Sequence, residues 1–362
     1  MTGYWSRMRI VITGASGNVG SALVRRLADD GGHELVGVVR RPPASDVSFP
    51  PMEWVAVDLT DDADTGALRA ACAGADAVVH LAWGFQPSHR DAYLRALGVG
   101  GTGRVIDAVV AAGVPHLVHM SSVGAYSPKR DDAPVDETWP TEGVPTSMYS
   151  RHKAAAERLL DELEVDAPDV TVTRVRPGII GQRSAGSALL RYGLPALVPA
   201  AVLRHVPVLP IDSGLVIPMV HADDVADALA RVLDARAPGA FNLAAEPPVT
   251  AQAVADVLGA RLLHVPSAAV RAAVSTSWHA RVQPLDPGWI DMGYAVPLLD
   301  TTRARTELGW EPSTNATLVL AETVAGMQDT AWSGTPILRP RTVAGGLARA
   351  LRRGPVSSRR AP

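Results

Sequence analysis

The clearest candidate for acid–base chemistry in the sequence is a tyrosine one helical turn before a lysine, Tyr149 and Lys153. A spacing of four residues puts both side chains on one face of the helix expected over residues 149–163. A free tyrosine, with a pKa near about 10, is a poor acid–base catalyst. A neighbouring ammonium favours the phenolate, so we expect Lys153 to lower the pKa of Tyr149. Lys153 is one of only two lysines in the chain, which gives the pairing weight.

A pair of serines, Ser121 and Ser122, ends the strand expected over residues 117–120. Ligands of parallel sheets bind at this carboxyl edge. There Ser122 could hydrogen-bond a substrate carbonyl oxygen and share its developing charge with Tyr149. Capping of the strand end explains both serines equally well. The histidines have no characteristic spacing to a nucleophile elbow. The single cysteine, Cys72, permits neither an internal disulfide nor a cysteine-based zinc site.

A glycine-rich turn follows the first expected strand and opens the first expected helix. It reads Thr13-Gly14-Ala15-Ser16-Gly17-Asn18-Val19-Gly20. Glycines here permit a tight turn, close approach of the backbone to a pyrophosphate, and close contact between helix and strand. The helix N-terminus adds free N–H groups and partial positive charge. Between an ordinary glycine-rich turn and a dinucleotide site, the strand–turn–helix context favours the dinucleotide site.

The end of the second expected strand bears on which dinucleotide binds. A protein selective for NAD usually has an acidic residue there for the ribose hydroxyls, whereas this chain has Arg40 and Arg41. Guanidinium groups bind phosphate oxygens in pairs, so the arginines favour NADP over NAD unless both are simply solvated. Asp58 and Leu59, after the third expected strand, are candidates to flank the adenine, although a plain strand-end aspartate is the alternative.

Short apolar runs alternate with helical patterns over the first third of the chain. The expected strands are residues 9–12, 35–39, 55–57, 77–81 and 117–120, and the expected helices are residues 21–29, 65–73 and 91–112. Such alternation implies parallel strands joined by right-handed crossovers. The fold class predicted is therefore α/β, with a doubly wound parallel sheet.

Beyond Pro177 the alternation of strand and helix patterns becomes irregular, and prolines interrupt it. We expect a dinucleotide-binding domain from residues 1–177 plus about 211–245, in which residues 216–220, 223–233 and 240–243 return to the sheet. A smaller, discontinuous second lobe is expected over about 178–210 and 246–330. Residues 331–362 carry seven arginines and no acidic residue, a composition that predicts a basic, mostly disordered tail.

Together these residues resemble the extended short-chain dehydrogenase/reductase superfamily, in its NAD(P)-dependent epimerase/dehydratase branch. The resemblance spans about residues 8–328. Its pieces stand in the expected order: the turn from Thr13 to Gly20, Asp58-Leu59, His80-Leu81-Ala82, Ser121-Ser122, Tyr149 to Lys153, Arg176-Pro177-Gly178, His221 to Ala226, and Glu307 to Pro312. No single motif is specific; the ordered combination is.

The resemblance implies a Rossmann domain with a smaller C-terminal substrate lobe, and a family that commonly pairs subunits implies a homodimer. It assigns catalysis to Ser122, Tyr149 and Lys153. The residues it implies for cofactor binding are Gly14, Gly17, Gly20, Arg40, Asp58, Leu59, Lys153, Leu81 and Ala82 (beside the ribose and pyrophosphate) and Pro177 (near the nicotinamide).

The chain departs from the family pattern at two places. Gly98 stands where the family usually has an asparagine before a Gly-Thr pair, which puts a proton relay through water in doubt and loosens the helix. Trp83 and then Phe85 follow Leu81-Ala82, where a small residue is usual. Trp83 could stack over the substrate, or it could pack at the sheet edge.

The predicted function is NADP-preferring hydride transfer between nicotinamide and a carbonyl or secondary alcohol. One alternative is a nucleotide-sugar epimerase or dehydratase that retains its cofactor; another is a non-catalytic dinucleotide sensor. The aromatic residues Trp83, Phe85, Trp278 and Trp289 hint at a hydrophobic substrate, such as a polyketide, steroid or flavonoid-like ketone, although tryptophans are more often core.

Charge and hydropathy bound the remaining partners and the compartment. A net charge of −3 gives no electrostatic reason to expect nucleic acid as the main ligand. The longest apolar stretch, residues 192–203, is short and contains two prolines, so we expect no membrane span. The single cysteine and the lack of a recognisable signal peptide predict a cytoplasmic protein.

Overall fold

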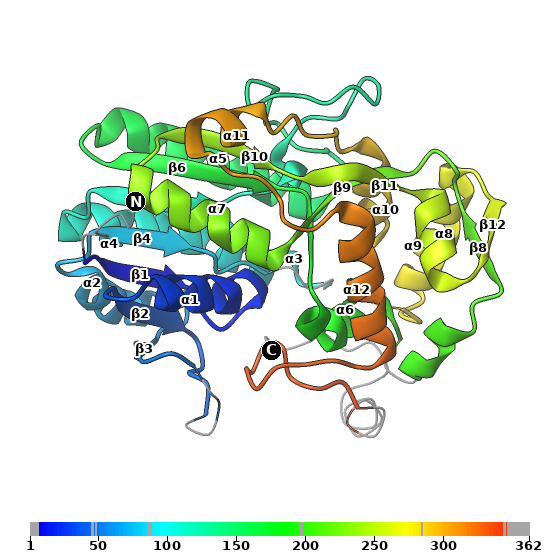
Figure 1. Ribbon diagram of the computed structural model, residues 1–362, viewed down its shortest axis with the longest axis horizontal. Coiled ribbons are helices and arrows are strands. Elements are labelled where there is room, and N and C mark those ends of the chain that lie inside the picture. Colours follow the sequence, from blue (N-terminus) through cyan, green and yellow to red (C-terminus); the bar gives the residue numbers. More distant parts are fainter. Residues whose placement is uncertain are drawn as a thin grey trace.

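A computed structural model describes residues 7–44, 47, 49–84, 89–195, 198–283, 285–342 and 345. Its larger part is built on one seven-stranded parallel sheet (Figure 1). In spatial order the strands are β10 (Gly239–Leu243), β6 (Thr171–Pro177), β5 (His116–Met120), β4 (Ala77–His80), β1 (Arg9–Thr13), β2 (Glu34–Val39) and β3 (Glu53–Ala56). The predicted doubly wound sheet is confirmed. Its order reverses between β1 and β4, the point at which such sheets bind ligands beyond their carboxyl ends.

Helices cover both faces of this sheet. One face carries α1 (Asn18–Asp30), α7 (Ala222–Ala235) and α11 (Thr302–Leu308); the other carries α2 (Thr65–Cys72), α4 (Gly101–Ala112) and α5 (Met148–Asp166). Before α4, the helix expected over residues 91–112 is divided into α3 (Asp91–Arg95) and a π-helical turn at Ala96–Gly100. The helix α1 ends at Gly31, whose φ is +72°.

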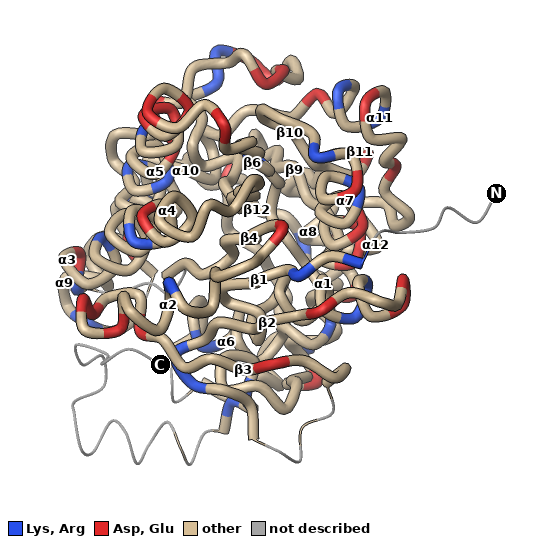
Figure 2. Tube along the Cα trace, turned by 90° about the vertical axis from the view of Figure 1, so that its left-hand side faces the viewer, with Lys and Arg blue, Asp and Glu red and all other residues tan. Residues whose placement is uncertain are grey.

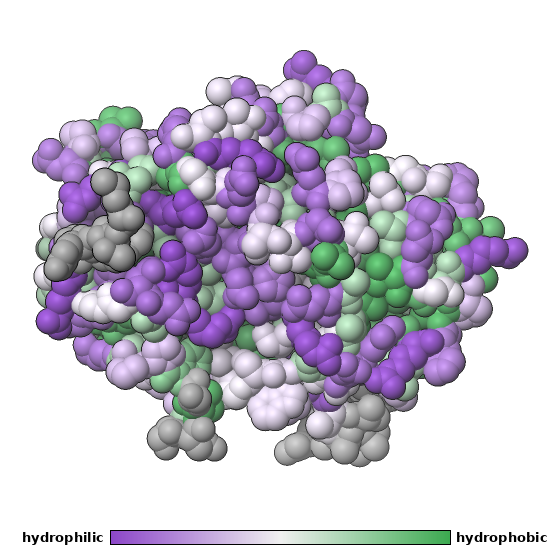
Figure 3. Space-filling view, viewed as in Figure 1, coloured by the Kyte–Doolittle hydropathy of each residue, from purple (hydrophilic) through white to green (hydrophobic). Residues whose placement is uncertain are grey.

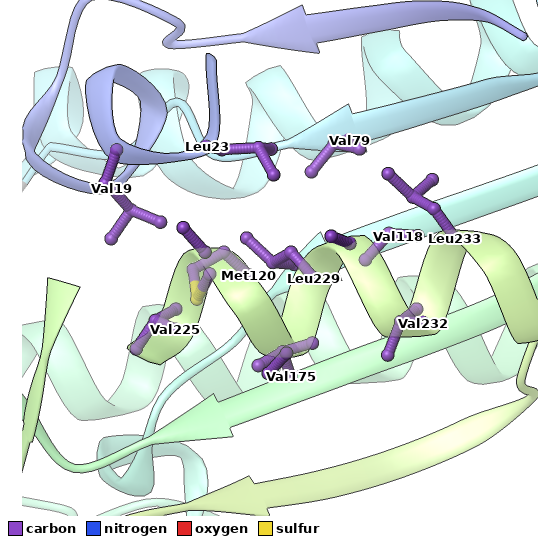
Figure 4. Packing of buried hydrophobic residues seen from close by; sticks show 14 of the residues in the cluster. Val19, Leu23, Val79, Val118, Met120, Val175, Val225, Leu229, Val232 and Leu233 are labelled. Atoms are coloured by element: carbon purple, nitrogen blue, oxygen red, sulfur yellow. The ribbon is translucent and has the colours of Figure 1, made fainter. Parts of the chain in front are cut away.

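Successive side chains along each strand point to opposite faces of the sheet, and each face has its own hydrophobic core. Ile10 and Ile12 of β1 pack with α1 and α7, whereas Val11 between them packs with α2 and α4. Figure 4 shows Val225 and Leu229 of α7 lying among the valines and leucines of the central strands and α1. Burying each such side chain contributes about 1.5–3 kcal/mol, so the strands at the site rest on a firmly packed base.

The second lobe combines two small sheets with five helices. Its elements are β7 (Ile179–Gly181), α6 (Gly186–Gly193), β8 (Val208–Ile211), β9 (Val216–His221), β11 (Ala245–Thr250), α8 (Ala251–Leu258), β12 (Arg261–His264), α9 (Ser267–His279), α10 (Pro287–Ala295) and α12 (Ala316–Gln328). Thr250 caps α8, since its hydroxyl accepts a hydrogen bond from the Ala253 N–H at 3.2 Å. Figure 3 shows that apolar residues are more frequent on this side of the molecule than over the large sheet.

The segments around β9 and α11 lie elsewhere than the sequence suggested. β9 was expected to return to the large sheet, but it pairs with β7 and β11 in a three-stranded sheet. The reason is that both edges of β6 are already occupied, by β5 and β10. Conversely α11, expected in the second lobe, packs on α7 and β10, and Trp310 after it is fully buried in the α1–α7 core.

The predicted disorder of the basic tail is wrong for its first part. Leu338 is 1% exposed, and the Arg341 guanidinium donates to the carbonyls of Pro195 and Val198 at 2.7 and 2.8 Å. Arg191 of α6 in turn donates to the carbonyls of Ile337 and Arg339. A basic composition does not prevent order where guanidinium groups find backbone acceptors. Residues 343–362, Gly345 apart, lie outside the described residues.

Charged residues gather on the outer helices and at strand ends, while the middle of the large sheet is nearly free of them (Figure 2). In the part of the chain that the structure describes, no helix has the length and hydropathy needed to cross a bilayer.

Candidate functional site

The turn between β1 and α1 requires glycine at the predicted positions. Gly14 has a φ of +72°, and a Cβ there would lie 2.9 Å from the backbone nitrogen of Ala82. A Cβ on Gly20 would lie 2.3 Å from the Gly14 carbonyl oxygen. The turn therefore lies directly against the Leu81–Ala82 backbone, so the structure brings these predicted cofactor-binding segments together at the switch point of the sheet.

The N-terminus of α1 has the donor set that a pyrophosphate needs. Its N-cap, Gly17, offers no side-chain acceptor, and no acidic residue stands in the first turn. Ser16 and Val19 are buried, which leaves the backbone N–H groups as the donors of this turn. The cradle of close glycines and the helix N-terminus thus fit a dinucleotide.

The side chain of Asn18 is engaged by the second lobe. The Gln182 amide donates to the Asn18 side-chain oxygen at 2.6 Å and to its backbone carbonyl at 2.8 Å. Gln182 was not singled out in the sequence, where nothing links it to a residue so far back in the chain. It joins the turn to the segment after β7.

At the end of β2, Arg40 meets Tyr93 of α3, whose hydroxyl lies 2.9 Å from the guanidinium. Burial raises the pKa of Tyr93, with Arg40 opposing the shift. Asp58 accepts hydrogen bonds from the N–H and hydroxyl of Thr60, at 3.0 and 2.8 Å. Leu59 is buried in the core beneath α4. Asp58 thus has a local capping role here, and Arg40 is the residue of this edge that suits a phosphate.

Two of the three predicted catalytic residues lie close together. Ser122 opposes the rise that burial causes in the pKa of Tyr149, and the Ser122 side-chain oxygen accepts from the Gly124 N–H at 3.0 Å. Gly124 permits this approach, because a Cβ there would lie 2.9 Å from the Tyr149 ring. The helix that carries Tyr149 begins at Met148, and its N-cap Ser147 accepts from the Ser150 N–H at 3.4 Å.

Lys153 faces a different partner. Its amino group donates to the Met120 carbonyl at 2.7 Å and lies 3.5 Å from the centroid of the Trp83 indole. The side chain is 2% exposed, and burial lowers the pKa of Lys153 to about 7, against the attraction of Glu157.

The expected lowering of the Tyr149 pKa by Lys153 is not what the structure shows. Burial raises the pKa of Tyr149 to about 12, and the hydrogen bond with Ser122 is the interaction that opposes the shift. At neutral pH the Tyr149 hydroxyl therefore carries its proton. A spacing of four residues fixes a shared helix face but not the direction of the lysine amino group.

A buried ionic network behind the site was missed. Glu157 is 1% exposed, receives paired hydrogen bonds from Arg176 at 2.9 Å each, and accepts from the Ser121 hydroxyl at 2.5 Å. Arg174 adds a contact at 3.2 Å. The network lowers the pKa of Glu157 although burial opposes it. The sequence signal that could have revealed this network is the position of Glu157, four residues after Lys153 and among apolar helix residues.

Aromatic rings surround Tyr149. The Trp83 centroid lies 6.3 Å away in an edge-on arrangement, and that of Trp289 on α10 lies 5.0 Å away. Pro177 ends β6 at the edge of the sheet, paired with Leu243. Phe85, the other aromatic residue predicted near the substrate, lies outside the described residues.

The chain is similar in sequence to a known family and to individual known proteins. The model of the NAD dependent epimerase/dehydratase family matches residues 10–244. The chain is 30% identical over 333 residues to a Mycobacterium tuberculosis (strain ATCC 25618 / H37Rv) protein named 3 beta-hydroxysteroid dehydrogenase/Delta 5-->4-isomerase, covering 84% of this chain and 86% of that one. It is 27% identical over 315 residues to an uncharacterised protein of the same strain, covering 85% of this chain and 29% of that protein. The chain thus spans less than a third of the length of the first curated relatives it matches.

Solved structures share the fold. The UDP-glucose 4-epimerase of Thermus thermophilus, in complex with NAD, is 23% identical with a TM-score of 0.65 over 89% of this chain and 99% of that one. The dTDP-glucose 4,6-dehydratase DesIV of Streptomyces venezuelae, with NAD and TYD bound, is 23% identical with a TM-score of 0.67 over 92% of this chain and all of that one.

Proposed function

Because the chain belongs to the NAD dependent epimerase/dehydratase family, we propose that it transfers hydride between a nicotinamide cofactor and the carbon of a ketone or secondary alcohol. The observation that carries the proposal is the placement of Ser122 and Tyr149 together at the carboxyl edge of the sheet, beside the glycine turn that fits a dinucleotide. The 30% identical relative is named as a hydroxysteroid dehydrogenase, and that name points to the same reaction type.

Each site residue has a distinct task in this proposal. The nicotinamide, when bound, supplies or accepts the hydride. Tyr149 is protonated at neutral pH and gives its proton to the carbonyl oxygen as that oxygen gains charge; in the reverse direction its phenolate takes the proton back. Ser122 donates to the same oxygen and holds it in place.

Lys153 serves as the cation beside the site. A phenolate formed at Tyr149 is stabilised by a nearby positive charge, and an amino group with a pKa of about 7 takes up a proton in the physiological range. Its bond to the Met120 carbonyl fixes the amino group at the end of β5 and uses one of its N–H groups, which leaves the others for a ribose hydroxyl.

NADP is the proposed cofactor. Arg40 ends β2 at the edge where the cofactor ribose is expected, and its guanidinium suits the paired hydrogen bonds of a 2′-phosphate. The solved neighbours cited above hold NAD, so a direct comparison of NADPH and NADH on this chain decides the point.

The test is the variant Tyr149→Phe, which removes the transferred proton and keeps the ring. With NADPH and a ketone such as 2-tetralone, we expect kcat/KM to fall by at least about 100-fold while NADPH binding, measured by nicotinamide fluorescence, stays close to wild type. Tyr294→Phe, whose hydroxyl contacts only the backbone of Asp212 among the described residues, is the matched control. Full activity of Tyr149→Phe would refute the proposed role.

The same assay separates the nucleotide-sugar alternative. An epimerase or dehydratase converts UDP-glucose or dTDP-glucose with no net change in NADPH, and would carry oxidised cofactor through purification. Stoichiometric NADPH consumption with a ketone supports the reductase; sugar conversion without consumption supports the alternative.

A further inference from the structure

Four of the described tryptophans fall into two environments. Trp278 and Trp310 are buried, at 8% and 0% exposure, as core tryptophans usually are. Trp83 and Trp289 keep part of their surface exposed, and both contact the ring of Tyr149. We name Trp83, Tyr149 and Trp289 the aromatic wall. It joins the two lobes, since Trp83 follows β4 and Trp289 belongs to α10.

The place of Trp83 in this wall is built into the backbone. A Cβ on Gly98 would lie 2.9 Å from the Trp83 ring, so any larger residue there would push the indole away. On another side the Lys153 amino group lies 3.5 Å from the ring centroid. The space that Gly98 leaves is the space that the indole fills.

The wall continues in apolar side chains on α10. Met292 lies one turn after Trp289, and a Cβ on Gly124 would lie 3.2 Å from its sulfur. The Ser147 hydroxyl contacts the same sulfur at 3.9 Å. Among the described residues, two indoles and a thioether thus lie near Tyr149, and such groups favour flat, uncharged surfaces.

Three arginines of the second lobe, Arg183, Arg191 and Arg204, have contacts within the described chain. Arg183 and Arg204 both pair with Asp329. Arg191 donates to the carbonyls of Ile337 and Arg339. Binding a nucleotide diphosphate through these arginines would first require breaking their present contacts, at a cost to affinity.

We propose that the aromatic wall takes a flat, uncharged ketone or secondary alcohol of two or more fused rings, and that Gly98 is the residue that lets Trp83 take part. This rests on the proposed function, because the carbonyl must reach Tyr149. Ring faces stacked on the indoles bury apolar area and hold the carbonyl at the Tyr149 and Ser122 hydroxyls.

The experiment compares 2-tetralone with cyclohexanone, a ketone with one ring fewer, in the full-length protein. We expect kcat/KM with NADPH to favour 2-tetralone by about tenfold or more. Trp289→Leu and Gly98→Ala should each reduce that preference by about tenfold, mainly through KM for 2-tetralone, while the dissociation constant for NADPH changes little. Trp332→Leu, a change at an exposed tryptophan, is the matched control.

A second comparison shows that Gly98 acts through Trp83. In a Trp83→Ala background the space around position 98 is open, so adding Gly98→Ala should have no further effect on the preference. Equal effects of Gly98→Ala with and without Trp83 would overturn the role given to Gly98. Equal kcat/KM for the two ketones, unchanged by Trp289→Leu, would overturn the substrate class.

Calorimetric binding of 2-tetralone in the presence of NADP separates this proposal from the previous one. Binding that Trp289→Leu weakens, without NADPH consumption, would keep the aromatic site and refute the reductase. Turnover of small or sugar substrates without 2-tetralone binding would keep hydride transfer and refute the aromatic substrate.

Discussion

His80 and His119 stand opposite each other on β4 and β5 with ring centroids 5.2 Å apart, yet only one of them has hydrogen-bond partners. The His80 ring nitrogens meet the hydroxyls of Thr13 and Thr102 at 2.7 and 3.2 Å. Within the described residues neither ring nitrogen of His119 has a hydrogen-bond partner. Both side chains are 1% exposed, so the pair isolates the effect of hydrogen bonding at constant burial.

The first prediction uses this pair. His80→Leu should lower the free energy of unfolding by about 1–3 kcal/mol, because it leaves two buried hydroxyls without their acceptor or donor. His119→Leu should be near neutral or stabilising, since it removes buried polar atoms that form no hydrogen bond. Urea unfolding of both variants checks this. A larger loss for His119→Leu than for His80→Leu would contradict it.

The second prediction concerns Lys153, whose pKa is lowered from 10.5 to about 7 by burial. Between these pH values the unfolded chain binds a proton that the folded chain lacks, so this group's contribution to stability rises with pH, by up to about 1.4 kcal/mol per pH unit. Below pH 7 the full cost of the buried charge remains. Lys153→Met should therefore stabilise the protein at pH 7, with a gain that shrinks towards pH 10.5.

Denaturation of Lys153→Met at several pH values measures that gain, with Lys129→Met, at the other lysine, as the control. The same variant should lose at least about 100-fold in kcat/KM, because the cation beside Tyr149 is gone. A stability gain that is independent of pH, or equal in both lysine variants, would argue against the burial of Lys153.

The third prediction concerns the ionic network. Glu157→Gln removes the countercharge of two buried arginines and should cost about 3–5 kcal/mol of stability. Glu307→Gln breaks the more exposed pair with Arg303 and should cost less than about 1 kcal/mol. Thermal unfolding of the two variants gives the comparison, and equal losses would count against the network.

The fourth prediction separates two helical glycines. Gly20→Ala forces a Cβ to within 2.3 Å of the Gly14 carbonyl and should distort the turn, with loss of both stability and NADPH binding. A Cβ added to Gly103 on α4 would have no atom of the described residues within 4 Å, so Gly103→Ala should stabilise by about 0.5–1 kcal/mol. NADPH binding and thermal unfolding of the two variants check this prediction. A loss of stability in Gly103→Ala, or unchanged stability and NADPH binding in Gly20→Ala, would contradict it.

The fifth prediction concerns cofactor selectivity. Arg40→Leu should reduce kcat/KM for NADPH by about tenfold or more and leave that for NADH nearly unchanged, because only NADPH carries the 2′-phosphate. Tyr93→Phe, which removes the hydroxyl partner of Arg40, should have a smaller effect in the same direction. Equal losses with both cofactors would mean that Arg40 supports the fold of this edge instead.

Local patterns accounted for most of the fold. The strands predicted over residues 9–12, 35–39, 55–57, 77–81, 117–120 and 240–243 appear within two residues of their predicted ends, because apolar runs act over short distances. The pairing of β9 could not be predicted in this way. It depends on which edges of β6 are free once β10 has paired, and that is a property of the assembled sheet.

The candidate site also has features that local motifs predict and features that depend on tertiary packing. The glycine turn and the Ser122–Tyr149 pair follow from motifs, and the structure brings them to one edge of the sheet. The direction of the Lys153 amino group depends instead on Trp83, whose position depends on Gly98 fifteen residues later. Such three-way packing leaves no periodic trace in a sequence.

The described start of the C-terminal basic segment gives its arginines an unexpected task. Arg341 donates to the backbone carbonyls that follow α6, and Arg191 of α6 donates to the carbonyls of Ile337 and Arg339. Hydrogen bonds therefore run in both directions between this segment and the region of α6. Positive charge held in these hydrogen bonds is withdrawn from the surface. A polyanion meeting Arg341 would find that its guanidinium group already binds the protein's own backbone.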